Sequence, residues 1–329
     1  MQRNDIMRMV PVAGVAVASI LGACLIGPAD LSAGEAMRGL FSADSAGVIV
    51  REIRLPRALA AWTAGAALGA SGAAMQGLLR NPLADPGVLG VSASAALGAV
   101  IAIYFNLSAA ASSATPMAAI LFALLATALL YAAGAGRLSP TRLILAGVGL
   151  SSLAGALIAL VMNLAPNPFI LSDLVNWLFG AVTNRSFADL ALTAPFIAAG
   201  MIAIMLAAPG LTALSLGEET AATLGADIPR TRALAIAGAA LMTGGSVALA
   251  GAIGFVGVVA PHLARPFVAH DPGRAIIPAA LIGGALLSLA DLCIRLLPFD
   301  QELKLGVAAA LIGAPAFIWI AARTQRIVR

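Results

Sequence analysis

Long apolar runs alternate with short polar connections along the chain. Ten of these runs approach the roughly 20 residues that a helix needs to cross a bilayer. Their predicted extents are Met9–Ile26, Ala58–Leu79, Val88–Phe105, Met117–Ala135, Leu143–Leu164, Phe187–Ala208, Ala233–Gly251, Ile253–Phe267, Ala275–Leu297 and Leu305–Ala322. The pattern predicts an all-α membrane protein with about ten transmembrane helices.

The composition supports a membrane setting. Of the 329 residues, 61% are hydrophobic and 10% are charged, whereas soluble domains average about 25% charged residues. So much apolar surface needs lipid as its solvent. No hydrophilic segment is long enough for a second domain, so residues 1–329 are expected to form one transmembrane permease domain.

One stretch of the sequence occurs twice. Leu55–Gly72 reads LPRALAAWTAGAALGASG, and Ile228–Gly245, 173 positions later (228 − 55), reads IPRTRALAIAGAALMTGG. About five predicted helices separate the copies, and an odd number inverts the second copy in the membrane. We therefore expect inverted repeats at roughly 55–165 and 228–322, with a pathway near their interface. Gly65 and Gly69 predict a face for close helix packing.

The basic residues indicate the orientation. With both termini in the cytoplasm, twelve fall inside: Arg3, Arg8, Arg80, Arg137, Arg142, Arg230, Arg232, Arg265, Arg274, Arg323, Arg326 and Arg329. Seven fall outside: Arg38, Arg51, Arg54, Arg57, Arg185, Arg295 and Lys304. The excess inside favours cytoplasmic termini. It also explains the net charge of +4 without nucleic acid as a partner.

The sequence carries no recognisable catalytic or metal-binding motif. The single lysine, Lys304, is followed by Leu305, so the Gly-Lys-Ser/Thr of a phosphate-binding loop is missing. Two histidines make no conventional metal site. We expect no enzyme activity, no catalytic or metal-ligating residue, and no cofactor held by this chain.

Two ionisable residues fall within predicted spans, where such groups are functional suspects. For His262 we favour a hydrogen-bonded packing role over a proton relay, because no chain of such groups is visible. Asp291 lies four residues before Arg295, a spacing that lets the two side chains pair.

Three inner polar segments stand out. Arg80–Gly87 has two prolines and predicts a stiff turn. In the second, Ser139 is placed to cap the helix that follows. The third, Leu214–Arg232, has Ser215 and Glu218 in a capping-box pattern and predicts a short cytoplasmic helix suited to a partner's groove. A solvated loop is the alternative.

The outer side has two further features. Arg51, Arg54 and Arg57 oppose the charge trend, which suggests an acidic protein or an anionic solute as partner. Ser172–Trp177, after Asn167-Pro168, predicts a short helix at the outer mouth.

Several ordered motifs resemble one family. They are RLPR at 54–57, GAALGASGAAMQGLLRNPLADPGVLGVS at 65–92, LILAGVG at 143–149, GAIGFVGVVAPHLAR at 251–265 and LIGAPAFIW at 311–319. Together they resemble the permease subunits of the iron-siderophore, haem and cobalamin (FecCD-type) ATP-binding-cassette importers, the type II importers. The resemblance runs from about Arg51 to Trp319.

This resemblance implies a multi-pass homodimer in the bacterial inner membrane, surrounded by membrane lipid. Two cytoplasmic ATPase subunits would bind ATP and magnesium, and a periplasmic binding protein would deliver the cargo. The segment at about 215–229 would be the coupling helix, with its ATPase contacts at Ser215, Leu216, Gly217, Glu218, Thr223, Leu224, Gly225 and Ala226. The cytoplasmic gate would comprise Asn81, Leu83, Pro140 and Thr141, and the binding protein would dock on Arg54, Arg57 and Arg295.

Two positions depart from the family pattern. Lys304-Leu305 stands where many members have Leu-Pro, and Pro140 stands where a small hydroxyl residue is common. The resemblance ranks the cargo as ferric siderophore first, haem second and cobalamin third. A secondary transporter driven by an ion gradient is the alternative, because it could have the same inverted repeat.

Overall fold

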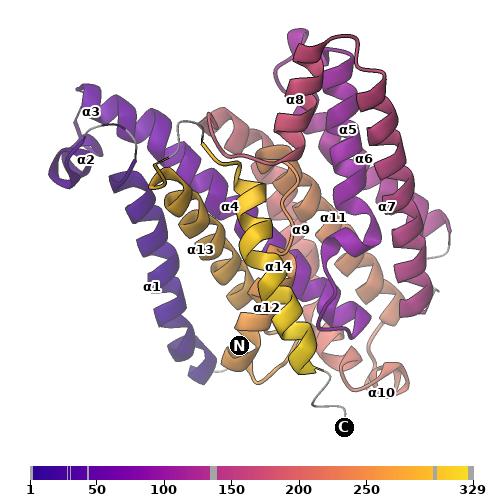
Figure 1. The fold of residues 1–329 in the computed structure, drawn as a ribbon. Helices are drawn as coiled ribbons and strands as arrows, with labels where there is room; N and C mark the ends of the chain where they lie inside the picture. The colour runs from indigo at the N-terminus through magenta and orange to yellow at the C-terminus, as the bar shows by residue number, and fades with distance from the viewer. Residues whose placement is uncertain are drawn as a thin grey trace.

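The computed structural model describes residues 3–27, 29, 31–42, 44–133, 139–298 and 302–324. All regular structure in these ranges is helical, which confirms the predicted fold class (Figure 1). The α-helices are α1 (Arg3–Leu25), α2 (Ala33–Gly39), α3 (Ser45–Val48), α4 (Leu55–Leu79), α5 (Val91–Tyr104), α6 (Ala114–Ala132), α7 (Pro140–Asn163), α8 (Pro168–Leu178), α9 (Phe187–Leu214), α10 (Glu218–Thr223), α11 (Ile228–Ala250), α12 (Val256–Ala264), α13 (Ile276–Arg295) and α14 (Leu305–Thr324). Shorter turns are the π-helical η1 (Ile49–Arg54) and the 3₁₀ turns η2 (Pro86–Leu89), η3 (Leu107–Ala109) and η4 (Arg265–Val268).

The apolar helices correspond to the ten runs that the sequence predicts. Within the described residues, six helical segments are long and apolar enough to cross a membrane, and four apolar helices are shorter. The shorter ones are Met9–Leu25, Val91–Tyr104, Val256–Val268 and Leu305–Ile320. The number of spans and the side on which the termini lie stay predictions.

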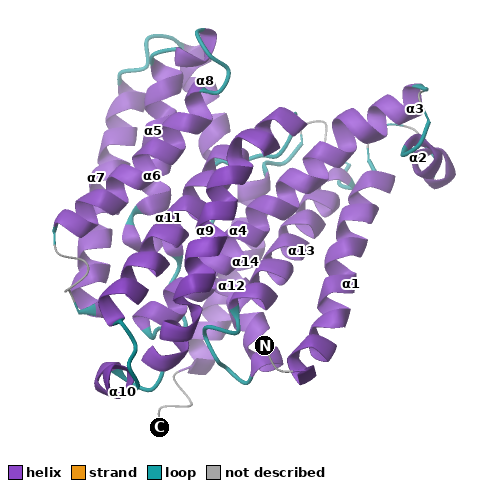
Figure 2. Cartoon of the chain, turned by 180° about the vertical axis from the view of Figure 1, so that it is seen from behind, coloured by secondary structure: helices purple, strands orange, loops and turns teal. Residues whose placement is uncertain are grey.

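The two ends of the bundle are distinguished by their short helices. α8 lies at one end, and α10 lies at the other together with the start of α1 and the end of α14 (Figures 1 and 2). We call these the α8 end and the α10 end; the topology prediction assigns the α10 end to the cytoplasm. Arg137, Arg326 and Arg329, counted in that prediction, lie outside the described residues.

α4 forms the centre of the subunit and packs on α13, α11, α12 and α9. Most of its residues are buried, and its glycines allow backbone contact. A Cβ built on Gly65 would lie 2.2 Å from the Gly283 oxygen, and one on Gly69 would lie 2.1 Å from the Ala279 oxygen. Only glycine fits at these distances, so the predicted small-residue face is confirmed as the α4–α13 contact.

The two repeat helices, α4 and α11, cross in opposite directions. Ser246 Oγ lies 3.2 Å from the Ala64 oxygen, whereas Thr243 Oγ1 lies 3.4 Å from Ser71 Oγ. A lower residue number on α4 thus meets a higher one on α11, as inversion of the repeats requires. The neighbours match as well: α4 packs on α12 and α13, and α11 packs on α5 and α6.

The eighth predicted helix is shorter than the sequence indicated. The prediction starts it at Ile253, but residues 251–254 have no regular secondary structure and α12 begins at Val256. Gly251 and Phe255 both have positive φ angles, 76° and 66°, which breaks the helix there. A non-helical segment inside a helical membrane bundle requires protein around it, because lipid cannot satisfy its backbone.

The α8 end contains short helices that the apolar pattern of the sequence does not predict. α2, α3 and η1 fill residues 33–54, and α2 begins with a capping box between Ser32 and Glu35. α8 itself confirms the predicted short helix, and Asn167 caps it through a 2.9 Å bond from the Ile170 amide to Asn167 Oδ1.

Candidate functional site

The predicted first gate segment, Arg80–Gly87, is a turned loop whose shape is held by hydrogen bonds from its own side chains. Asn81 Oδ1 accepts a 2.9 Å bond from the Leu83 amide, and Asp85 Oδ1 accepts a 2.7 Å bond from the Gly87 amide. Burial raises the pKa of the Asp85 carboxyl above its usual value, and the bond from Gly87 opposes this rise. The loop is therefore a stiff unit, as its prolines predict.

This loop reaches the first turn of α12. A Cβ on Gly257 would lie 2.7 Å from Asp85 Oδ2 and 2.8 Å from Pro86 Cδ. On its other side the same helix touches α4, because a Cβ on Gly72 would lie 1.9 Å from the Gly257 oxygen. The gate loop, α12 and α4 thus meet with no room for one added methyl group.

The second gate residues, Pro140 and Thr141, form the first turn of α7. Ser139 is the N-cap residue, as expected, but its side chain makes no capping hydrogen bond. Two turns further on, a Cβ on Gly147 would lie 2.1 Å from the Val88 oxygen of η2. Because η2 directly follows the first gate loop, α7 and that loop can move only together or by sliding at Gly147.

The predicted coupling segment forms a helix, but a shorter one. α10 spans Glu218–Thr223, with Gly217 as its N-cap. The predicted capping box at Ser215 is wrong: the Ser215 hydroxyl donates a 2.6 Å bond back to the Thr212 oxygen, at the end of α9. Glu218 instead accepts a 2.5 Å bond from Arg232 on α11. This ion pair fixes α10 against the second repeat.

The remaining coupling residues shape the two ends of α10. Gly217 and Gly225 have φ angles of 103° and 83°, which suit glycine and turn the chain sharply. Leu216 and Leu224 are 62% and 66% exposed. Thr223 Oγ1 donates to backbone oxygens of α10, and Ala226 packs against the main core. Exposed leucines beside a short helix give a surface that a partner's groove could cover.

The gate and coupling segments share one cavity at the α10 end. Its volume is about 230 Å³. The residues that line it are Ala73, Gln76, Gly77, Arg80, Asn81, Pro82, Ser215, Pro261, Arg265, His270, Pro272 and Ala275. Asn81 of the predicted gate and Ser215 of the predicted coupling segment thus line the same cavity, although 134 positions (215 − 81) separate them. We call it the α10-end cavity.

Arg54, a predicted docking residue, is buried at the α8 end. Its side chain is 3% exposed and donates hydrogen bonds to the carbonyl oxygens of Cys24, Leu25 and Ala29. Cys24 and Leu25 belong to the last turn of α1, whose carbonyls have no partner within the helix. Arg54 therefore holds the end of α1 against the start of α4.

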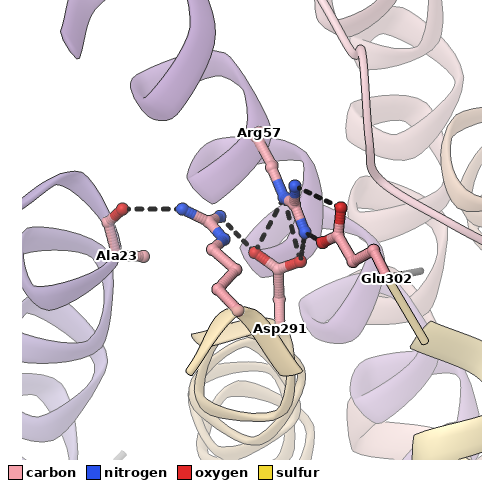
Figure 3. Close-up of polar contacts among 5 residues, drawn as sticks. Ala23, Arg57, Asp291 and Glu302 are labelled. Atoms are coloured by element: carbon pink, nitrogen blue, oxygen red, sulfur yellow. Dashed lines mark hydrogen bonds and ion pairs between the residues drawn. The ribbon is translucent and has the colours of Figure 1, made fainter. Parts of the chain in front are cut away.

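The other two docking arginines converge on Asp291 (Figure 3). Arg57 reaches Asp291 and also Glu302, in the connection before α14. Arg295 pairs with Asp291 as the sequence predicted, and it donates a 2.9 Å bond to the Ala23 oxygen. Sequence reasoning missed both acids as partners of Arg57, because only the fold brings them together. The docking role of these arginines stays a prediction.

The hydrogen-bonded packing role predicted for His262 is not seen at its Nδ1 atom. Nδ1 is buried and has no partner among the described residues. Among all the described residues, no three or more His, Cys, Asp or Glu side chains lie together in a group that could hold a metal ion.

The chain matches a known protein family along most of its length. The FecCD transport family model matches residues 15–323. The vitamin B12 import system permease BtuC of Vibrio cholerae is 43% identical over 281 residues, 84% of this chain and 83% of that protein. The ferric enterobactin permease FepD of Escherichia coli is 38% identical over 281 residues, again 84% of this chain and 83% of its own.

A solved structure shares the fold. It is described as a metal-chelate type ABC transporter in an inward-facing conformation, and it superimposes with a TM-score of 0.84 at 30% identity, covering 97% of this chain and 99% of its own. Because the family model matches residues 15–323 and the apolar helices fit a membrane protein, this chain belongs to the FecCD transport family of membrane permeases.

Proposed function

We propose that the chain is the permease subunit of an ATP-binding-cassette importer that moves an iron chelate or cobalamin from periplasm to cytoplasm. The family match over residues 15–323 carries this proposal. We rank ferric siderophore first, haem second and cobalamin third, by how common each cargo is in the family. Relatives named for cobalamin and for ferric enterobactin have similar identities, so cobalamin stays in the test.

The proposed mechanism is alternating access driven by the partner ATPases, which bind ATP and magnesium. Three adjoining contacts support a mechanical route for it. The coupling segment at Ser215 shares the α10-end cavity with the gate loop at Asn81. That loop continues into η2, and η2 abuts α7 at Gly147, two turns from Pro140 and Thr141. A push on α10 would reach both gate segments through packed backbone.

A homodimer is proposed because α7 offers a large uncovered face. Only 11% of the residues in its most apolar 18-residue window are buried within the subunit. Leu145, Leu153 and Leu160 are 65%, 58% and 53% exposed, and their spacing of about two turns puts them on one face. In the proposed dimer, part of this face contacts the second copy and part lines the pathway.

The docking proposal for the periplasmic binding protein rests on Arg57, since Arg54 and Arg295 bond mainly to the end of α1 and to Asp291. Glu302 already occupies part of the Arg57 guanidinium and is half-exposed, at 36%. An acidic residue of the binding protein would have to compete with Glu302 for Arg57.

The alternative, a carrier driven by an ion gradient, gains no support from Asp291. The carboxylate is 1% exposed and pairs with Arg57 and Arg295, so it belongs to a buried structural ion-pair cluster and is not an open group on a pathway.

Uptake into liposomes tests the proposal. The vesicles would hold the full chain with its partner ATPase, and the binding protein would be added with labelled ferric siderophores, haem or cobalamin. Accumulation of one cargo only with ATP on the ATPase side would support the importer and identify its substrate. Accumulation without ATP, or driven by a proton gradient, would establish the alternative.

A further inference from the structure

The α10-end cavity carries an unbalanced positive charge. Arg80, Arg265 and His270 line it, and no acidic residue does so among the described residues. The nearest acid in sequence, Asp271, directs its Oδ1 elsewhere: to Thr212 Oγ1 at 2.7 Å and to the amides of Gly273 and Arg274 at 2.9 and 3.2 Å. Within the described residues, no ion pair joins Arg80, Arg265 or His270 to a carboxylate.

Arg265 is the most buried of the three basic groups of the cavity. It lies at the end of α12 and is partly buried, whereas Arg80 and His270 are exposed. Its described partner is the amide oxygen of Gln76, 2.5 Å from Nη2. Gln76 is itself 5% exposed and donates a weak 3.4 Å bond to the Val258 oxygen. Gln76 thus orients a guanidinium whose remaining donors can take an oxyanion.

The backbone conformations of Arg80 and His270 support a functional role for their side chains in the α10-end cavity. Arg80 and His270 have φ angles of 49° and 65°, in the left-handed region where glycine is the usual residue. Both are exposed, so neither is needed for the core. The chain accepts a strained conformation at two positions that each bring a basic group to one cavity.

The remaining wall also suits an anion. Ala275 lines the cavity and is the N-cap of α13, so the positive end of this 20-residue helix begins there. A volume of about 230 Å³ could hold several water molecules, at roughly 30 Å³ each, and so has room for a phosphate group.

We propose that the α10-end cavity binds a phosphate oxyanion, either free phosphate or the headgroup of an anionic phospholipid, between Arg80, Arg265 and His270. The bound anion would join the gate loop, the end of α12 and the coupling segment at Ser215. Its presence would then bias how the gate responds to α10. This site is independent of the cargo that the protein transports.

Arg80→Gly is the most informative variant. It removes one guanidinium and relieves the positive φ, so it should leave the melting temperature unchanged or raise it while weakening anion binding about tenfold. Arg265→Gln should weaken binding at least as much. Arg230→Gln is the matched control, because Arg230 is exposed at the same end of the bundle and does not line the cavity.

Two measurements separate the sources of the anion. Native mass spectrometry of the full chain would compare retention of phosphatidylglycerol with that of phosphatidylcholine. Thermal unfolding would compare inorganic phosphate with chloride at equal ionic strength. Retention of phosphatidylglycerol that Arg80→Gly and Arg265→Gln reduce, and Arg230→Gln does not, supports a headgroup site. A phosphate-dependent rise in melting temperature with the same variant pattern supports a free anion.

Three results would overturn the proposal. One is that neither probe distinguishes wild type from the cavity variants. Another is an equal loss in Arg230→Gln, which would mean diffuse surface charge alone. The third is that the cavity variants weaken association with the ATPase and bind both anions as wild type does, which would assign the cavity to a carboxylate of that partner.

Discussion

Asp291 Oδ1 lies 2.7 Å from Arg57 Nη2, and this contact joins α13 to α4 across 234 positions of sequence. Asp291 also pairs with Arg295, so one buried carboxylate balances two guanidinium groups. Removal of such a carboxylate leaves buried charge without compensation, which is far more destabilising than the loss of a surface pair.

We therefore predict that Asp291→Asn lowers the free energy of unfolding by about 3–5 kcal/mol. Thermal unfolding of the purified protein would measure this. Glu302→Gln is the control, because Glu302 is 36% exposed and its loss should cost less than about 1 kcal/mol. Equal effects of the two variants would contradict the central role of Asp291.

The contact between Arg57 and Glu302 in this cluster leads to a prediction about docking of the binding protein. Arg57→Gln should weaken docking, and Glu302→Gln should strengthen it, because it removes the internal competitor for the guanidinium. Both differences should shrink as salt is added. Titration of the binding protein onto the reconstituted permease would measure them. Arg38→Gln, an exposed arginine on α2, is the charge-matched control. Docking that is the same in all variants would refute the assignment.

The backbone contact between Gly72 and Gly257 predicts a sharp response to one methyl group. Gly72→Ala should destabilise the protein by about 1–3 kcal/mol or distort the gate, since its Cβ would meet backbone and not a flexible side chain. Gly149→Ala on α7 has nothing within 4 Å in the subunit and should be tolerated. Limited proteolysis and thermal unfolding of the two variants would show whether this contrast holds.

The coupling assignment rests on α10 and its link to α11. Glu218→Lys reverses the contact with Arg232 and should release α10 from the second repeat. ATP hydrolysis by the partner subunits should then continue while transport falls several-fold. Gly225→Val should act similarly, because valine is strained at a φ of 83°. Normal transport per ATP in both variants would show that α10 is not the coupling element.

The uncovered face of α7 predicts cross-linking between two copies. In a background in which Cys24 and Cys293, the two cysteines of the chain, are replaced, Leu145→Cys, Leu153→Cys and Leu160→Cys would be oxidised in turn. We expect at least one of them to form a disulfide-linked dimer in membranes. Met201→Cys on α9, which packs against the core of its own subunit, should stay monomeric. Absence of any α7 cross-link would argue against this face as the dimer contact.

The sequence predicts the long helices well, because their boundaries depend on local chemistry. The predicted end at Leu79 and starts at Phe187 and Leu305 match the structure. The capping box at Ser186 fixes the start of α9 through Asp189, the same local rule that places α2 after Ser32. That rule, applied to residues 31–35, would have found α2.

The sequence predictions that differ from the structure fail where contacts between distant segments determine the local structure. Ser215 and Glu218 have the spacing of a capping box, but α9 continues to Leu214 and its last turn takes the Ser215 hydroxyl. Ile253 is as apolar as the residues of the neighbouring helices, yet it lies in a non-helical segment. The roles of Arg54 and Arg57 depend on where α1 ends and on two acids more than 230 positions away from Arg57. No local pattern contains that information.

The non-helical segment at 251–254 also sets an order for biogenesis. Protein shelters it on two sides: a Cβ on Gly251 would touch the Gly180 Cα at 2.7 Å, and a Cβ on Gly306 would lie 3.0 Å from the Ala252 oxygen. Gly306 belongs to α14, which is synthesised after this segment. Until α14 has been inserted, the bare backbone of this segment faces lipid or translocon. A nascent chain truncated before Leu305 should therefore be a substrate for membrane proteases, and the subunit becomes resistant to them only when α14 packs over this segment.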